Sequence, residues 1–185
     1  MVVLGKIIVA MTMEGGIGKD GGIPWRIPED MKFFKQETLL APVNKKNAVI
    51  MGRHTWNSLN CRPLPNRLNI IVSKSLWEAD ASRAVFVPNF AAAIDIVEKA
   101  ADEIHAVYAI GGTQIYRSAL SHPLFTKLLV TKIIKPNYEC DTFFPCTFAY
   151  ECGWDLNLTE HLETQIITNN AVEISINEIT LSKNK

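Results

Sequence analysis

The sequence predicts an α/β protein with a central, mainly parallel twisted sheet flanked by helices, and three observations carry this prediction. Several strand-like runs are almost entirely apolar (IIVAM, NAVIM, NIIVS and AVYAI), which is typical of strands buried on both faces. These runs alternate with helix-like segments, as they do in parallel sheets. Near the C-terminus, Val172, Ile174 and Ile176 alternate with polar residues. That alternation predicts a half-buried strand, paired antiparallel at the edge of the sheet.

The individual elements follow from local patterns along the chain. The first helix begins at Pro28, because proline is favoured at the first helical position, and its apolar stripe consists of Ile27, Met31, Phe34 and Thr38. The expected strands are Gly5–Thr12, Asn47–Met51, Leu68–Ser73, Ala84–Val87, His105–Ile110 and Lys127–Ile134. The expected helices are Pro28–Thr38, Arg53–Leu59, Phe90–Ala100 and Thr113–Leu120. With no repeats or linker-like stretches, residues 1–185 are expected to form a single domain.

The composition limits the partners and the compartment. Lysine plus arginine equals aspartate plus glutamate, with 19 of each, so bulk attraction to nucleic acid or to an anionic membrane is not expected. No run approaches the ~18 apolar residues of a membrane span, and the N-terminal run lacks the charged leader of a signal peptide. The four cysteines form no CxxC pair, so no metal site is expected. We interpret them as reduced thiols in a cytoplasmic protein, and a disulfide among the last three stays open.

The segment GGIGKDGG, residues 15–22, contains the letters of two nucleotide-binding motifs. The P-loop interpretation fails, because Met13 and Asp20 stand where that motif needs glycine and serine or threonine. The letters GxGxxG are present at Gly16, Gly18 and Gly21. That motif requires a helix to open in the loop, whereas here the chain continues Gly-Ile-Pro-Trp, which does not open one. The segment is therefore predicted to be a flexible or tightly turning loop.

Asp30 lies beside the apolar stripe of the first expected helix, three residues after Ile27 and four before Phe34. A carboxylate beside a buried face is unusual. Burial would raise the pKa of Asp30, while the helix N-terminus would lower it. Two interpretations stay open: Asp30 acts in catalysis, or like Glu29 it only stabilises the start of the helix.

Residues at the carboxyl ends of parallel strands are candidates for ligand contacts. Gly52–Thr55 combines the backbone N–H groups of a helix N-terminus with two basic side chains, as phosphate sites do. Ser73-Lys74 ends the next strand and can share that phosphate if the two strands are neighbours; solvated surface cations are the alternative. Gly111-Gly112 lets a ligand approach the backbone closely. Arg67 can clamp a carboxylate bidentately or be a plain surface residue.

Together these motifs resemble those of the dihydrofolate reductase family, specifically its stand-alone type. The resemblance covers roughly residues 5 to 180. Its blocks, in chain order, are IVAM…GGIGKDGGIPW, PEDMKFFK, VIMGRHTWNSL, RPLPNRLNIIVS, AIGGTQIY, LLVTKI and CDTFFP. It implies a mainly parallel sheet of about eight strands with an antiparallel C-terminal edge strand, covered by helices. It also implies that GGIGKDGG is a mobile lid over the active site.

The resemblance implies NADPH-dependent reduction of 7,8-dihydrofolate to tetrahydrofolate, with hydride delivered to C6 and a proton to N5. The product supplies one-carbon metabolism and thymidylate synthesis. Asp30 would be the acidic group of the pteridine pocket and would promote proton delivery through water. Thr131 would bond Asp30 or its water, Trp25 would orient that water, and Ile23 would lie against the pterin. A cis peptide would join Gly111 and Gly112 beside the nicotinamide.

The resemblance assigns further residues to two binding sites. The residues expected to contact the substrate, with Asp30 and Thr131, are Ile8, Val9, Ala10, Met31, Phe34, Lys35, Ser58, Leu59, Leu64, Arg67, Ile110 and Tyr116. Those expected to contact NADPH are Ala10, Ile17, Gly18, Gly21, Gly52, Arg53, His54, Thr55, Ser73, Lys74, Ile110, Gly111, Gly112, Thr113, Gln114 and Ile115. Arg67 would clamp the α-carboxylate of the glutamate tail, with Lys35 adding charge. The 2′-phosphate and pyrophosphate contacts would be Arg53, His54, Ser73 and Lys74.

Two rival functions stay open at this level. One is a riboflavin-pathway pyrimidine reductase on the same scaffold, against which Asp30 and Arg67 argue because both fit a pterin with a glutamate tail. The other is a non-catalytic folate- or nucleotide-binding protein. Gln114 and Asn89 stand where some family members carry a phosphate-binding arginine, which weakens the expected preference for NADPH over NADH. The resemblance also implies a monomer that binds antifolates.

Overall fold

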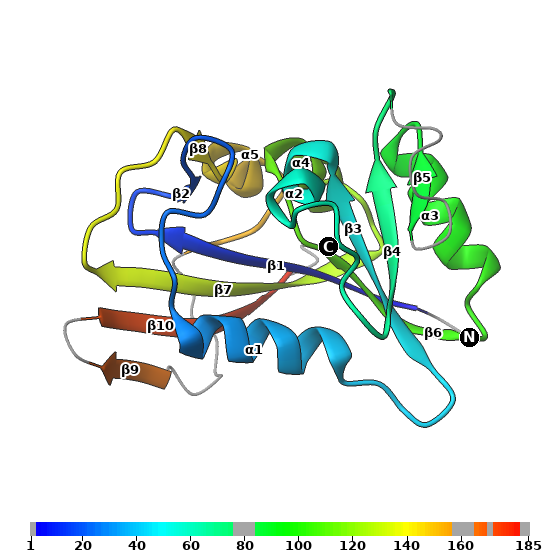
Figure 1. Ribbon diagram of the computed structural model, residues 1–185, viewed down its shortest axis with the longest axis horizontal. Coiled ribbons are helices and arrows are strands. Elements are labelled where there is room, and N and C mark those ends of the chain that lie inside the picture. The colour runs from blue at the N-terminus through cyan, green and yellow to red at the C-terminus, as the bar shows by residue number, and fades with distance from the viewer. Residues whose placement is uncertain (1–2, 76–83, 157–164, 170–171, 182–185) are drawn as a thin grey trace.

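A computed structural model of the chain describes residues 3–75, 84–156, 165–169 and 172–181. Its central feature is a twisted eight-stranded sheet (Figure 1). The strands are β1 (Leu4–Thr12), β3 (Lys46–Gly52), β4 (Arg67–Val72), β5 (Val85–Val87), β6 (Ile104–Ala109), β7 (Phe125–Lys135), β9 (Gln165–Asn169) and β10 (Val172–Thr180). The helices are α1 (Pro28–Leu39), α2 (Arg53–Ser58), α3 (Phe90–Lys99), α4 (Thr113–Leu120) and α5 (Cys146–Glu151).

The strand order across the sheet is β5-β4-β3-β6-β1-β7-β10-β9. The pairings from β5 to β7 are all parallel, and β10 runs antiparallel to both β7 and β9. This confirms the mainly parallel sheet of about eight strands with an antiparallel C-terminal strand. One detail differs from the prediction: β9 pairs with the outer side of β10, so the edge position belongs to β9. The sequence run Val172–Asn177 is thus the inner strand of a hairpin.

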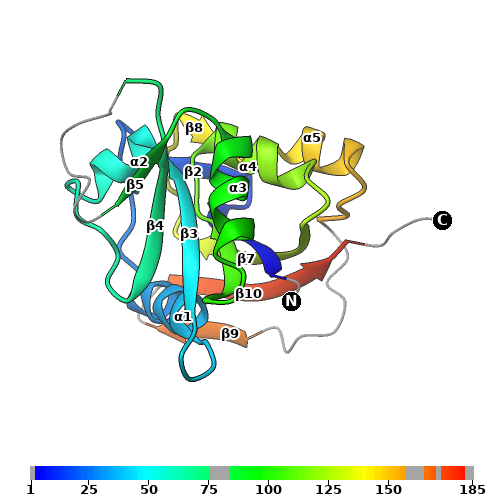
Figure 2. The same cartoon turned by 90° about the vertical axis from the view of Figure 1, so that its right-hand side faces the viewer.

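The two faces of the sheet pack against different helices. On one face, Ile7, Val9 and Met11 of β1 join a cluster with residues of α3 and α4. On the other face, Ile8 joins a cluster with Trp56 of α2 and aromatic residues of α1. The alternation follows from the two-residue period of a strand. In Figure 2, α2 lies to the left of β3 and β4 while α3 and α4 lie to their right.

Four elements were not expected from the sequence, namely β2 (Gly16–Gly18), β8 (Thr142–Phe143), α5 and β9. Each of these is short. β2 and β8 are too short to show an apolar period in the sequence. They pair antiparallel with each other, and Gly18 lies opposite Thr142, which is 124 residues later in the chain. The expected strands and helices are present, with ends that agree or differ by no more than three residues; for example, Ser73 and Ile110 lie just beyond β4 and β6.

All four cysteines are free, so the disulfide that the sequence left open is not formed. Within the described residues, none of the helices has the length and apolarity that crossing a membrane requires.

Candidate active site

Two adjoining cavities open at the carboxyl ends of the parallel strands. The first, which we call the deep cleft, has a volume of about 580 Å³ and lies between α1, α2 and β1. The second, the outer cavity, has a volume of about 630 Å³ and lies over the starts of α2 and α4. Gly21, His54, Gly112 and Thr142 line both. The two cavities therefore form one continuous site.

The residues that the sequence pointed to converge on this site. The deep cleft is lined by Ile8, Val9, Ala10, Ile17, Gly18, Ile23, Trp25, Asp30, Met31, Phe34, Lys35, Thr55, Ser58, Leu59, Leu64, Arg67, Ile110, Gly111 and Tyr116, among others. The outer cavity is lined by Gly52, Arg53, Ser73, Lys74, Thr113, Gln114 and Ile115, by the four shared residues, and by Val72, Ser75 and Asp141. Thr131 alone among the predicted residues lines neither cavity, and it contacts the site through Asp30.

Asp30 is the one carboxylate among the described residues that line the deep cleft. It lies in the first turn of α1, which begins with Pro28 and has no side-chain cap at Ile27. Burial raises the pKa of Asp30, and a hydrogen bond from the Thr131 hydroxyl lowers it, with burial the larger effect. Thr131 is itself buried on β7. The pKa of Asp30 is therefore raised, which means that its uncharged form is favoured more than it is for a carboxyl group in water.

The walls around Asp30 are partly open. Trp25 is buried and packs on Tyr138, with ring centroids 5.5 Å apart. Ile23 and Met31, in contrast, are 64% and 55% exposed. Large apolar side chains that face a cleft and remain this exposed offer surface for an apolar ligand to cover.

The glycine segment forms a tight turn beside the deep cleft. The backbone groups of Lys19 and Gly22 exchange two hydrogen bonds, of 3.0 and 2.9 Å. Asp20 and Gly21, between them, have φ angles of 50° and 76°, a left-handed pair that suits glycine at the second position. No helix follows, so the tight-turn prediction is confirmed and the dinucleotide-motif interpretation is excluded on geometry. Pairing of β2 with β8 fixes the start of the segment.

The outer cavity gathers the predicted anion contacts. β3 and β4 are neighbours, with Gly52 in register with Val72, so the two clusters do meet. Arg53 and Lys74 are exposed, and the Arg53 guanidinium donates a hydrogen bond to the Ser75 hydroxyl at 2.9 Å. Gly52 and Gly112 are the N-cap residues of α2 and α4. Two helix starts and basic side chains around one cavity are suited to a phosphorylated ligand.

The Gly111-Gly112 peptide bond is cis, as the family resemblance implied. Gly111 has a φ of 119°, a backbone angle that few side chains tolerate. Its carbonyl oxygen accepts a hydrogen bond from the Gly52 backbone N–H at 2.8 Å. Beneath it, the buried Tyr116 hydroxyl donates to the Ile8 carbonyl at 3.0 Å, and burial raises the pKa of Tyr116. Tyr116 is therefore a neutral support of this wall.

Arg67 lies at the far end of the deep cleft from the outer cavity's cations. Its Nε donates to the Pro65 carbonyl at 3.1 Å, and its Nη1 donates to the Thr38 hydroxyl at 2.7 Å. Partial burial lowers the pKa of Arg67 from its ordinary value, but a guanidinium remains charged at neutral pH. A half-buried, oriented guanidinium is suited to binding a carboxylate.

Sequence reasoning missed several residues of the site. Asp141 and Thr142 line the outer cavity, and Asp141 accepts a hydrogen bond from the Asp20 backbone N–H at 2.8 Å. Both residues belong to the block CDTFFP, which resembles a block of the family but to which the resemblance assigned no role. Ser75 lines the outer cavity at the carboxyl end of β4, where its position after the strand was the signal, and Pro65 lines the deep cleft without any local pattern that could have identified it.

Comparison with known proteins gives a consistent result. The family model described as dihydrofolate reductase matches residues 5–178. The dihydrofolate reductase of Schistosoma mansoni is 41% identical over 154 residues, covering 81% of this chain and 80% of the relative. That of Drosophila melanogaster is 39% identical over 144 residues, covering 76% of this chain and 78% of the relative.

A bifunctional dihydrofolate reductase-thymidylate synthase of Glycine max is 41% identical over 147 residues, which cover 76% of this chain but 28% of the relative. Among solved structures, Schistosoma mansoni dihydrofolate reductase superimposes with a TM-score of 0.80 at 33% identity, over 98% of this chain and 100% of that one. The matches in sequence, in fold and in the site all agree, and the chain belongs to the dihydrofolate reductase family.

Proposed function

We propose that the continuous site described above reduces 7,8-dihydrofolate to 5,6,7,8-tetrahydrofolate with NADPH, for one-carbon metabolism and thymidylate synthesis. One observation carries the proposal. A carboxylate with a raised pKa, Asp30, lies in an apolar cleft that is continuous with a cation-lined cavity. A pterin needs the first of these features, and a phosphorylated dinucleotide needs the second.

The residues of the outer cavity fit NADPH. Arg53 and Lys74 provide cationic side chains, His54 provides an imidazole, and the starts of α2 and α4 provide backbone N–H groups. Arg53 and Lys74 would hold the 2′-phosphate, which NADH lacks, and Gly111-Gly112 would lie beside the nicotinamide. When bound, the cofactor supplies the hydride for C6 of the pteridine. The chain positions the two reactants, which lowers the barrier by several kcal/mol in well-oriented reactions, about 7–11 at the upper end.

Asp30 has two roles in this proposal. Its ionised carboxylate accepts hydrogen bonds from N–H groups of the pteridine ring, and its negative charge favours the pterin that is protonated at N5. The Thr131 hydroxyl keeps the carboxylate oriented through its hydrogen bond. Trp25 and Ile23 close the cleft on the side of the glycine turn, where they limit the water that reaches N5 and orient what remains.

The other end of the cleft is suited to the benzoylglutamate arm of the substrate. Phe34, Leu59 and Leu64 form apolar walls there. Arg67 follows at the start of β4, and Lys35 lines the same cleft from α1. The guanidinium of Arg67 binds the α-carboxylate of the glutamate, and Lys35 adds positive charge.

The direct test mixes the protein with NADPH and dihydrofolate and follows the loss of near-ultraviolet absorbance. Turnover that requires both compounds supports the proposal. Binding of either compound without turnover would indicate a non-catalytic binding protein. Turnover of a ribosylated diaminopyrimidine in place of dihydrofolate would indicate a pyrimidine reductase. Inhibition by an antifolate that competes with dihydrofolate adds an independent readout of the deep cleft.

We further propose that the chain acts as a single domain, in the cytoplasm and as a monomer. The family resemblance supports this expectation. Light scattering on the eluted peak of a sizing column tests the oligomeric state, where a mass of twice 20.7 kDa would contradict a monomer.

A further inference from the structure

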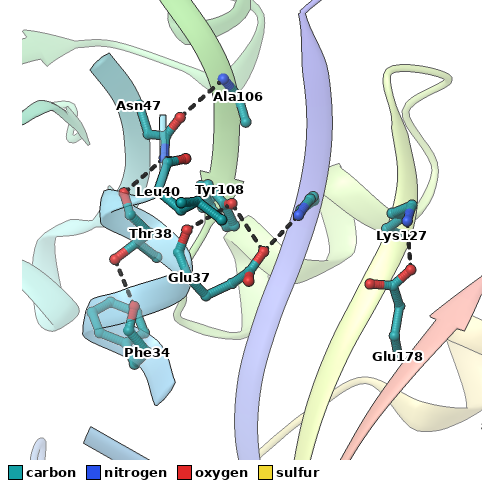
Figure 3. Close-up of polar contacts among 10 residues, drawn as sticks. Phe34, Glu37, Thr38, Leu40, Asn47, Ala106, Tyr108, Lys127 and Glu178 are labelled. Carbon is teal, nitrogen blue, oxygen red and sulfur yellow. Dashed lines mark hydrogen bonds and ion pairs between the residues drawn. The ribbon is translucent and has the colours of Figure 1, made fainter. Parts of the chain in front are cut away.

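Thr38, which the sequence placed on an apolar stripe, carries a polar role in the structure. It lies in the last turn of α1 and is fully buried, at 0% exposure. Its hydroxyl donates a hydrogen bond to the Phe34 carbonyl at 2.7 Å, drawn in Figure 3. The same hydroxyl oxygen accepts a hydrogen bond from Nη1 of Arg67 at 2.7 Å. Because its proton is committed to the helix, the lone pairs of the hydroxyl are left for Arg67.

These contacts orient the guanidinium. Of its five N–H groups, the Nε–H is bound to Pro65 and one Nη1–H to Thr38. Within the described part of the chain, this leaves both N–H groups of Nη2 and one of Nη1 for a ligand. At least two N–H groups are needed to bind a carboxylate bidentately.

Thr38 is itself fixed to the sheet. The Asn47 amide donates to the Thr38 carbonyl at 2.9 Å and to the Leu40 carbonyl at 3.0 Å, and its oxygen accepts from the Ala106 backbone N–H at 3.1 Å. The Tyr108 hydroxyl donates to the Glu37 carbonyl at 2.9 Å. Figure 3 shows these bonds converging on the end of α1 from β3 and β6. Thr38, which supports Arg67, therefore cannot shift without breaking hydrogen bonds to β3 and β6.

The position of Thr38 along α1 connects it to the other end of the substrate. Asp30 and Thr38 are eight residues apart on one helix, which corresponds to about 12 Å along its axis. The helix α1 thus carries both Asp30, which would bind the pteridine, and Thr38, which supports the arginine that would bind the glutamate tail.

We propose that Thr38 is a positioning residue that sets the preference of this chain for pterins ending in an α-carboxylate, by holding Arg67 ready to bind it. The inference rests on the proposed function, in which Arg67 binds that carboxylate. Loss of the Thr38 hydroxyl frees the guanidinium to turn away, and binding must then restrict it again.

The experiment replaces Thr38 by Val, which keeps the shape and removes the hydroxyl, and by Ser, which restores the hydroxyl. The readout is the ratio of kcat/KM for dihydrofolate to kcat/KM for a 7,8-dihydropterin that has a 6-methyl group in place of the benzoylglutamate arm. We expect Thr38→Val to lower this ratio on the order of tenfold, which corresponds to about 1.4 kcal/mol. Thr38→Ser should recover most of it. Thr38→Ala repeats the test if the valine variant does not fold.

A double-mutant cycle with Arg67→Leu separates positioning from plain stability. If Thr38 acts through Arg67, Thr38→Val has no further effect on the ratio in the Arg67→Leu background. A matched control, Thr126→Val on β7 away from the cleft, should leave the ratio at the parent value. The inference on Thr38 is overturned if Thr38→Val lowers kcat/KM equally for both substrates. It is also overturned if Thr38→Val leaves the ratio unchanged while Arg67→Leu lowers it. Neither outcome affects the proposed function. A ratio that Arg67→Leu does not change overturns the carboxylate assignment and the inference with it.

Discussion

The hydroxyl of Thr131 on β7 donates a hydrogen bond to the carboxylate of Asp30 in the first turn of α1. The pair joins β7, which lies between the parallel strand β1 and the antiparallel strand β10, to the first turn of α1. Burial raises the pKa of Asp30 and this bond lowers it. The bond therefore offsets part of the effect that burial has on the pKa of Asp30.

The first prediction concerns the activity of Asp30. Asp30→Asn removes the charge that favours a pterin protonated at N5. Turnover of dihydrofolate at neutral pH should fall by about 10²–10⁴-fold, with partial recovery at low pH, where the substrate arrives protonated. Steady-state rates between pH 5 and 8 measure this. Glu29→Gln is the matched control, because it removes a neighbouring carboxylate of the same helical turn that does not line either cavity. Rates near the parent value at neutral pH would exclude the role.

The same substitution should stabilise the fold. The pKa of Asp30 is raised in the folded chain above its ordinary value of 3.8, so the folded state binds more protons than the unfolded state between these two values. Stability therefore falls as the pH rises through this window, and above the folded pKa the buried charge costs its full amount. Asp30→Asn removes that cost. Its Tm should exceed that of the parent at neutral pH, by about 2–4 °C for each 1 kcal/mol.

Calorimetry of both proteins over a range of pH tests this sign. The difference in Tm should shrink as the pH falls and vanish below 3.8, where the carboxyl is protonated in both states. A variant that is less stable than the parent at neutral pH would show that the carboxylate contributes more through its hydrogen bond to Thr131 than it costs through burial.

Much of the fold could be predicted because its signals are local. Apolar runs such as NAVIM identify the central strands, and Pro28 identifies a helix start. β2 and β8 could not be predicted in this way, because each consists of two or three residues whose only support is the other strand. β9 was missed as well, and with it the fact that β10 is an inner strand.

The residues of the site also divide into those with a local sequence signal and those that depend on distant contacts. Residues at strand ends and helix starts, such as Gly52 and Ser73, could be placed because parallel strands bring their carboxyl ends together. Thr38 could not be assigned its role, since helical periodicity places it on an apolar stripe and its partner Arg67 is 29 residues away. Asp141 depends on a contact to Asp20 across 121 residues. Long-range polar contacts leave no period in the sequence.

The third prediction concerns cofactor preference. Arg53→Ala combined with Lys74→Ala should raise KM for NADPH on the order of tenfold or more, because contacts between charged groups are lost. KM for NADH should change little, because NADH lacks the 2′-phosphate. Steady-state kinetics with both cofactors measure the two values. The control pair Arg62→Ala and Lys99→Ala removes two exposed cations outside both cavities. An equal effect on NADPH and NADH would contradict the 2′-phosphate assignment.

The last prediction tests whether the glycine segment acts as a lid over the reactants and makes no phosphate contact. A Cβ atom at Gly18 would lie 3.0 Å from the Gly22 carbonyl oxygen, whereas one at Gly22 would meet only the Lys19 oxygen, at 3.8 Å. Gly18→Val should therefore distort the turn and lower kcat on the order of tenfold, if the segment closes over the reactants as a lid. Gly22→Ala should do less. Binding of adenosine 2′,5′-bisphosphate, measured by calorimetry, should be retained in Gly18→Val, because its contacts lie at Arg53 and Lys74. Loss of that binding would mean that the segment holds phosphate after all.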